Sequence, residues 1–319
     1  MKKLNYLLMG MFLALAFTSC KTGDDETPAY QPPSATEFAE IRQNFLDALT
    51  QTQTFDATEG LAFTSPKGVN VNIYGLSATG NVQLRYIELF DIGTMALANR
   101  PLMGKDYFTE KVLPLVTGGE FFIEVTQNGT KLDGNANLQV PVEYTIGADP
   151  AEMSIWTSDE ESTVWVEGGG EMALPGGVDQ PGGSGATSYY YCWLPFSWTN
   201  IDWLYSLPGE QTQLRVKVPN GYDDTNASIY AAFLTQPNTL ASLDVYDKEV
   251  KYFTEHTGIA PIGYQMFLIF ISGDPKGKQF VYATKLVTVE ANQYVTFTDA
   301  DLHTGSAQQI IDAINGLYK

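Results

Sequence analysis

The sequence predicts an all-β protein made of two tandem β-sandwich domains, with a short N-terminal helix and a short C-terminal helix. Three observations lead to this prediction. Residues that favour strands are abundant in the 319-residue chain, of which 13% is aromatic. Hydrophobic and polar residues alternate over many short runs, as in strands with one buried face. Turn residues separate these runs.

The first 19 residues have the composition of a signal peptide. Two lysines are followed by an apolar run over residues 7–17, and Cys20 comes shortly after it. This run is shorter than the about 20 helical residues that span a hydrocarbon core. The small residue before the cysteine resembles a bacterial lipobox, although Phe17 stands where that motif usually has Leu. We therefore expect cleavage before Cys20 and lipidation of Cys20. The alternative is an ordinary signal peptide in which Cys20 is incidental.

Residues 20–36 are expected to be the lipidated cysteine and a flexible tether. Lys21 is followed by Asp24-Asp25-Glu26, and three prolines occur between residues 27 and 33. A lysine and acidic residues just after a lipobox cysteine resemble the surface-export signal of Bacteroidota lipoproteins. The resemblance implies a protein that its lipid anchors to the outer membrane, exposed on the cell surface. A polar tether without a sorting role is the alternative.

The first sandwich domain is expected over residues 37–166. Its helix is predicted at about residues 36–50, because Ser34 and Glu37 form a capping-box pattern ahead of apolar residues at helical spacing. Beyond the helix the hydrophobic period becomes two, which indicates strands. The alternating runs lie at residues 69–73, 82–86, 121–125 and 138–142. Asn128-Gly129 between two of them is a strong hairpin signal.

A change of composition divides the chain. Eight of the eighteen residues from Gly168 to Gly185 are glycine, which predicts a flexible linker over residues 167–185. The second sandwich domain is expected at residues 186–319. Its alternating runs lie at residues 214–218, 229–233, 266–271 and 280–297. A second capping-box pattern, Ser306 to Gln309, predicts a closing amphipathic helix.

Charge excludes one class of partner. The chain has 18 basic and 37 acidic side chains, a net charge of −19. A field of this sign repels phosphate backbones, so we expect no nucleic-acid partner. The partners we expect are the membrane, through the lipid anchor, and a glycan or protein ligand.

Turns and core positions in both halves resemble a poorly characterised group of two-domain β-sandwich surface lipoproteins of the Bacteroidota type. The matching segments are residues 87–91, 118–119, 122–125, 128–132, 218–222 and 261–264. The resemblance covers most of the mature chain. It implies fold and location, and it brings no catalytic residue with it.

Side chains that could carry catalysis are sparse. His256 and His303 are the only histidines, and neither has a metal-ligand spacing. Cys192 has no basic residue near it in sequence to lower its pKa, so a buried thiol is expected. Paired carboxylates are harder to dismiss, because a glycosidase needs two whose separation the sequence does not give. The densest acidic groups are Asp159-Glu160-Glu161 and Asp223-Asp224.

No cofactor or metal is expected. Asp223-Asp224-Thr225-Asn226 and Asp299-Ala300-Asp301 carry oxygen atoms that suit Ca²⁺, but neither has the glycine and terminal glutamate of an EF-hand loop. We therefore predict a non-enzymatic module that binds a glycan or protein or takes part in an assembly. The alternative is a surface enzyme resembling glycoside hydrolases that uses paired carboxylates.

All five tryptophans lie between residues 156 and 203. Aromatic rings suit the faces of sugars and the side chains of a partner protein. One hypothesis is a ligand-binding surface formed by Trp193, Trp198 and Trp203, because Pro195 interrupts the strand pattern between the first two and loops present exposed rings. The alternative is that these rings belong to the core.

Overall fold

A computed structural model describes residues 30–141, 152–159, 162–173, 189–205, 208–255 and 258–318. The expected signal peptide, Cys20 and most of the tether lie outside the described residues, as do residues 174–185 of the expected linker. The chain is predominantly β, as the sequence predicts, and it has several sheets and three short helices, one more helix than predicted. In the described part of the chain, no helix is long and apolar enough to cross a membrane.

Two sheets form the N-terminal half. The eight-stranded sheet has the order β1 (Gln51–Asp56), β4 (Asn81–Leu89), β6 (Val112–Gln127), β13 (Trp198–Leu204), β9 (Ser154–Ser158), β10 (Trp165–Glu167) and β5 (Met103–Lys105), with β7 (Thr130–Lys131) paired to β6. β5 also pairs with β6, so β6, β13, β9, β10 and β5 close into a five-stranded barrel, which differs from the simple sandwich that the sequence predicts. The β12 sheet has the order β11 (Glu171–Ala173), β12 (Tyr189–Pro195), β8 (Asn135–Pro141), β3 (Asn70–Ile73) and β2 (Leu61–Thr64).

Two further sheets form the C-terminal half. The β21 sheet has the order β17 (Ala241–Ser242), β16 (Ala227–Phe233), β21 (Gln265–Asp274), β22 (Gln279–Thr288) and β24 (His303–Gly305). The β15 sheet has the order β18 (Val245–Asp247), β19 (Tyr252–Thr254), β15 (Arg215–Lys217) and β23 (Tyr294–Thr296). The short pair β14 (Gln211–Thr212) and β20 (Ala260–Pro261) lies beside them.

Each half has a core between its two sheets, and a third core joins the halves. Leu84 of β4 and Leu138 of β8 meet in the first core, and Leu268 of β21 and Val216 of β15 meet in the second. The third core lies between the eight-stranded sheet and the β21 sheet. Strand β21 serves two cores, because alternate side chains point to opposite faces: Leu268 enters the second core and Ile269 the third.

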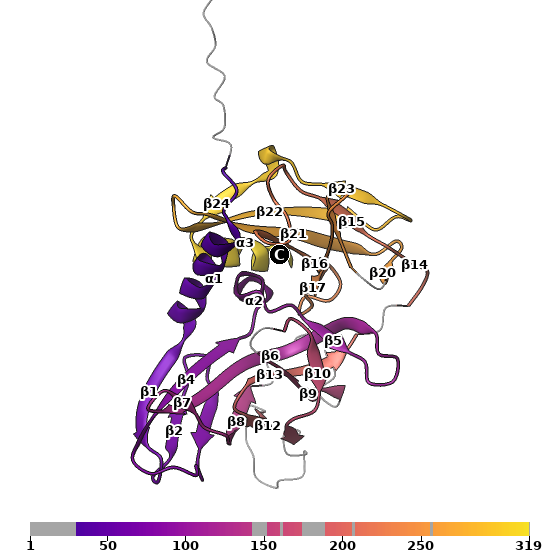
Figure 1. The fold of residues 1–319 in the computed structure, drawn as a ribbon. Coiled ribbons are helices and arrows are strands. Elements are labelled where there is room, and N and C mark those ends of the chain that lie inside the picture. The colour runs from indigo at the N-terminus through magenta and orange to yellow at the C-terminus, as the bar shows by residue number, and fades with distance from the viewer. Residues whose placement is uncertain are drawn as a thin grey trace, which may run out of the picture.

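Three helices fill the space between the halves, as Figure 1 shows: α1 (Ala35–Leu49), α2 (Ile92–Ala98) and α3 (Ala307–Asn315). The 3-10 turns η3 (Asp299–Asp301) and η4 (Gly316–Tyr318) flank α3. Both predicted capping boxes are present, at Ser34 and at Ser306. The sequence analysis missed α2, which packs against α3 through Gly93. A Cβ on Gly93 would lie 2.9 Å from the Ile311 Cα atom.

Strand pairing differs from the expected domain limits in two places. β12 and β13 follow the expected linker in sequence, yet they pair with β8 and β6 of the N-terminal half. β11 lies within the expected linker and pairs with β12. Residues 189–204 therefore complete the sheets of the first half, because their hydrophobic side chains fill its core.

Candidate binding face

The structure does not bring the three predicted tryptophans together. Trp193 on β12 is 53% exposed. Trp198 on β13 is 5% exposed and packs in the third core, with its ring 5.2 Å from Phe122. Trp203 is half-buried against the first core. Of the three, only Trp193 offers an open ring.

Trp193 belongs to a polar and aromatic surface on the outer side of the β12 sheet. Along β12, the exposed side chains of Tyr191 and Trp193 alternate with the buried side chains of Tyr190, Cys192 and Leu194. Strand register extends the surface sideways. Trp193 is opposite Asn137, which is opposite Asn72, and Tyr191 is opposite Gln139, which is opposite Asn70. We call these six residues the aromatic–amide face.

Hydrogen bonds order part of this face. Asn70 Nδ2 donates to Gln139 Oε1 at 3.2 Å, and Thr64 Oγ1 donates to Asn70 Oδ1 at 2.7 Å. Amide groups both donate and accept hydrogen bonds, so the row can match hydroxyl groups of either polarity. Two rings about 7 Å apart on one strand lie beside that row. This combination suits a ligand with apolar faces and a hydroxylated edge.

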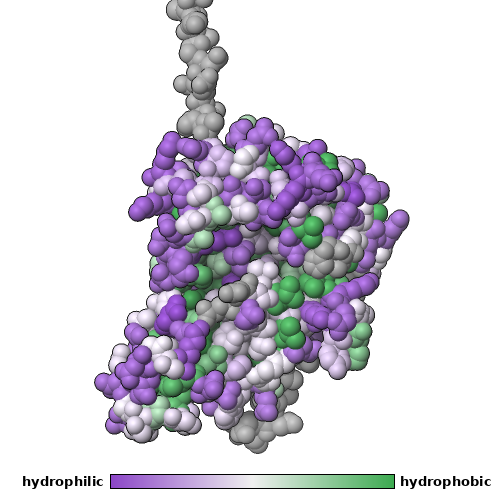
Figure 2. Space-filling model, viewed as in Figure 1, coloured by the Kyte–Doolittle hydropathy of each residue, from purple (hydrophilic) through white to green (hydrophobic). Residues whose placement is uncertain are grey.

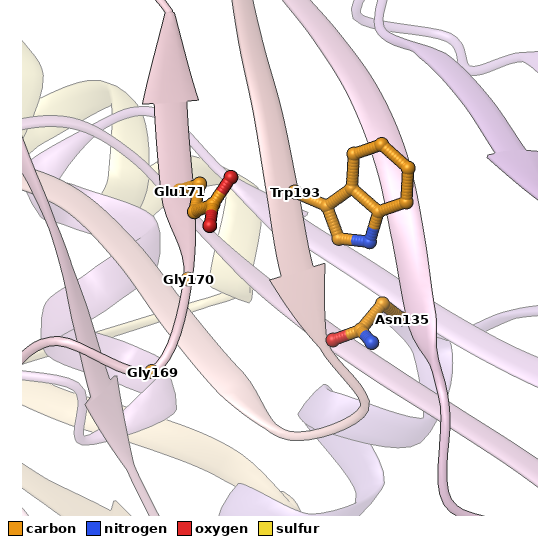
Figure 3. A pocket seen from close by; sticks show the side chains of 5 residues that line it. All are labelled: Asn135, Gly169, Gly170, Glu171 and Trp193. Atoms are coloured by element: carbon orange, nitrogen blue, oxygen red, sulfur yellow. The ribbon is translucent and has the colours of Figure 1, made fainter.

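A hollow of about 480 Å³ continues the face past Trp193. Figure 3 shows that Glu171 stands beside Trp193 on the neighbouring strand and that Asn135 borders the hollow. Gly169 and Gly170 form its other wall. A Cβ on Gly170 would lie 2.7 Å from the Trp193 carbonyl oxygen, so a side chain is excluded there by the backbone. The hollow has the size of a small-molecule site.

The carboxylates best placed for joint chemistry lie elsewhere, buried on β6 and β13 of the eight-stranded sheet. Glu120 on β6 is opposite Asn200 on β13. Asn200 Nδ2 donates to Asp202 Oδ2 at 2.6 Å, and Thr117 Oγ1 donates to Asn200 Oδ1 at 2.7 Å. Glu120 and Asp202 are both 0% exposed, and among the described residues neither Glu120 oxygen nor Asp202 Oδ1 has a hydrogen-bond partner. Sequence reasoning missed this pair, because strand pairing joins residues 82 positions apart.

Burial sets the protonation of this pair. It raises the pKa of Glu120 well above its ordinary value, against the opposing charge of Arg100. Burial also raises the pKa of Asp202 well above its ordinary value, and the charge of Glu120 adds to the rise. Two neighbouring buried carboxyl groups resist ionisation for these reasons. A substrate cannot touch either group in this structure.

The other side chains that the sequence analysis considered for chemistry are buried, exposed singly, bonded to neighbouring groups or outside the described residues. Burial raises the pKa of the Cys192 thiol to about 12, which leaves it un-ionised at neutral pH. His303 is exposed on β24, and His256 lies outside the described residues. Asp223 Oδ1 accepts from the Thr225 backbone, and Asp301 Oδ2 pairs with Lys285 at 2.9 Å. Within the described ranges, no group of three or more His, Cys, Asp or Glu side chains is placed to hold a metal.

Comparison with known proteins gives no family. No protein-family model matches the chain, and no curated protein matches it.

Proposed function

We propose that this protein is a non-enzymatic, lipid-anchored cell-surface protein with two tandem β-sandwich domains, which binds a neutral glycan through the aromatic–amide face. The observation that carries the proposal is the placement of Tyr191 and Trp193, 48% and 53% exposed, at alternate positions of one strand beside a row of amides. Sugar rings have apolar faces that stack on aromatic rings and hydroxyl edges that bond to amides.

Charge favours a neutral ligand. The six residues of the face carry no charge, and Glu171 at its border is acidic. The whole chain has a net charge of −19, which opposes the approach of an anionic polymer. A glycan also fits better than a protein partner, because amides outnumber the two rings on a face without an aliphatic patch.

The position of the chain's first described residues supports surface presentation. Tyr30 packs at the border of the second core, and Pro32 lies beside Gly221 of the C-terminal half. In Figure 1, the chain enters at the top of the molecule and the β12 sheet lies at the bottom. A lipid at Cys20 would therefore hold the molecule by the end opposite the aromatic–amide face.

The second candidate function is hydrolysis by paired carboxylates, and the pair that we consider for it is Glu120 and Asp202. Glu120 and Asp202 lie close together, but both are fully buried. A glycosidase needs both carboxyl groups at the scissile bond, one of them with access for water. Burial of both groups therefore favours binding over turnover.

Affinity electrophoresis of the detergent-solubilised mature protein tests the proposal. Gels would contain uncharged glucans, mannans or xylans. A neutral glycan should retard the protein, and Trp193→Ala should weaken binding about fivefold or more, because stacking on a ring at the centre of a site contributes upwards of about 1 kcal/mol. Tyr294→Ala is the matched control, since Tyr294 is also 53% exposed but lies on the β15 sheet.

Two results would contradict the proposal. One is that no neutral glycan retards the protein, or that Trp193→Ala binds as well as the unmodified protein. The other is release of new reducing ends that stops when a single Asp or Glu is replaced, which would establish the hydrolase alternative.

A further inference from the structure

A second hollow, of about 380 Å³, lies between the two halves beside α1. Its wall includes Arg42 on α1, Arg100 after α2, Trp198 on β13, and Ser162 and Thr163 between β9 and β10. We call it the arginine hollow, because it holds two of the four arginines of the chain. It lies on the other side of the eight-stranded sheet from the aromatic–amide face.

Arg42 reaches from α1 towards the C-terminal half. Its Nη2 atom donates to Ser228 Oγ at 3.0 Å and to Tyr230 Oη at 3.1 Å. The guanidinium lies 4.1 Å from the centre of the Phe38 ring. Its Nε atom is buried and has no hydrogen-bond partner in the described part of the chain. Burial lowers the pKa of Arg42, and its contact with Tyr230 opposes the change.

Arg100 approaches from the N-terminal half and is 5% exposed. Its guanidinium is 4.6 Å from the Trp165 ring centre and 4.3 Å from that of Trp198. Nη1 donates to the Ser162 carbonyl oxygen at 3.0 Å, and Nε is buried without a partner within the described ranges. Burial lowers the pKa of Arg100 to about 10, although Glu120 and Asp159 attract the charge from the surrounding strands.

The hydrogen-bond balance of these two groups is incomplete. Two guanidinium groups have ten N–H donors. Three hydrogen bonds from them are made within the described chain, two by Arg42 and one by Arg100. Buried donors without partners cost stability, and buried cations cost more. The structure therefore places two guanidinium groups around one hollow, each with a buried Nε donor that has no partner among the described residues.

We propose that the arginine hollow binds a small oxyanion, such as a carboxylate, sulfate or phosphate group. Guanidinium groups bind such anions in pairs of parallel hydrogen bonds. The net charge of −19 repels anions at long range, but ionic screening limits that field to about 8–10 Å in physiological salt. The two charged side chains that line the hollow are both cationic, whereas Glu120 and Asp159, which attract Arg100, do not line it. Because Arg42 contacts the C-terminal half and Arg100 belongs to the N-terminal half, the bound anion fastens the halves together.

Thermal melting of the mature protein tests this inference with three probes: inorganic phosphate, sulfate and acetate, each at constant ionic strength against chloride. We expect at least one of them to raise Tm by several degrees and to change the fluorescence of the tryptophans, since Trp198 lines the hollow. Arg42→Gln and Arg100→Gln should abolish both responses. Arg85→Gln is the control, because Arg85 instead pairs with Glu124 at 2.9 Å. Equal responses in all variants would reveal a general salt effect and overturn the proposal.

A variant that adds charge covers the case in which the arginine variants do not fold. Thr163→Asp places a carboxylate in the hollow and should raise Tm without added anion while removing the anion response. A lower Tm with the response intact would contradict the proposal. A last variant replaces Glu160 and Glu161, which lie outside the described residues, to test whether carboxylates of the chain itself bind the two arginines. If anions bind only when both are replaced by glutamine, the chain's own carboxylates are the occupant and the proposal fails.

Discussion

Replacing Glu120 with glutamine is expected to stabilise the protein at neutral pH, although the change removes a fully buried native side chain. Among the residues that the structure describes, both Glu120 oxygens are buried without a hydrogen-bond partner, and so is Asp202 Oδ1. A glutamine amide has the same shape and can donate to Asp202 Oδ1. Each buried polar group without a partner costs about 1–3 kcal/mol. We therefore expect a gain of about 1–3 kcal/mol in the free energy of unfolding, at about 2–4 °C in Tm for each kcal/mol.

The pH dependence gives the sharper test. The pKa of Glu120 is raised in the folded state, chiefly by burial. Above the unfolded pKa of about 4.3 the unfolded chain releases a proton that the folded protein keeps. Stability from this group is therefore fully present below pH ~4 and is lost as pH rises towards the folded pKa. The advantage of Glu120→Gln should be small at pH 4 and grow with pH.

Glu124→Gln is the matched control on the same strand. Although burial opposes the change, hydrogen bonds from Lys131 and Arg85 lower the pKa of Glu124. The sign is therefore reversed: the wild-type contribution is present above the unfolded pKa and fades in acid. Urea unfolding of both variants from pH 4 to 8 measures the difference. A Glu120→Gln variant that is less stable than wild type at every pH would refute the reasoning.

Three further outcomes are expected. Cys20→Ala should release the protein from the membrane fraction, and persistent membrane association would argue against the lipid anchor. Trp198→Ala should lower the free energy of unfolding by about 3–5 kcal/mol because its ring is buried, whereas Trp193→Ala should change it by less than about 0.5 kcal/mol; denaturant titration compares them. Gly93→Ala should lower the free energy of unfolding by about 1–3 kcal/mol, and with it Tm, because the added Cβ atom would clash with Ile311.

Local sequence patterns predicted the two helices that are determined by residues close together in the sequence. The helix near residues 36–50 and the closing helix follow from capping side chains and an amphipathic period, and the structure has both. α2 has no such period, because all seven of its residues are buried. Its signal was the N-cap alone: Asp91 Oδ1 accepts from the Thr94 backbone at 2.8 Å. A helix without a polar face is hidden from periodicity arguments.

The pairing of strands that are distant in sequence was not predictable, and this pairing determines which tryptophan is exposed at the candidate site. Trp193 and Trp198 are five residues apart, on consecutive strands. β12 joins a sheet with one free face, whereas β13 lies inside the eight-stranded sheet, which is covered on both faces. Alternation shows that neighbours point to opposite sides but not which side meets water. The same limit hid the Glu120–Asp202 pair and the arginine hollow.

In Figure 2, much of the visible surface is hydrophilic, and hydrophobic side chains gather near the junction of the halves and on part of the lower half.

Contacts around the exposed rings explain why the binding proposal rests on Trp193 and takes Tyr294 as its control. On the β15 sheet, the Tyr294 ring is 5.8 Å from that of Tyr252 and 5.4 Å from the Arg215 guanidinium. Those contacts give Tyr294 a structural role within its own sheet.

Trp193 has no such neighbours: across the described ranges, neither an aromatic ring nor a cation stacks on it. Its ring stays open to water above a hollow whose glycine wall admits no side chain. An exposed tryptophan adds little to the stability of a sheet, since the water-facing part of its apolar surface is not removed from water on folding. Stacking with a ligand would remove that surface from water, so the affinity of Trp193→Ala, rather than its stability, is the measurement that decides its role.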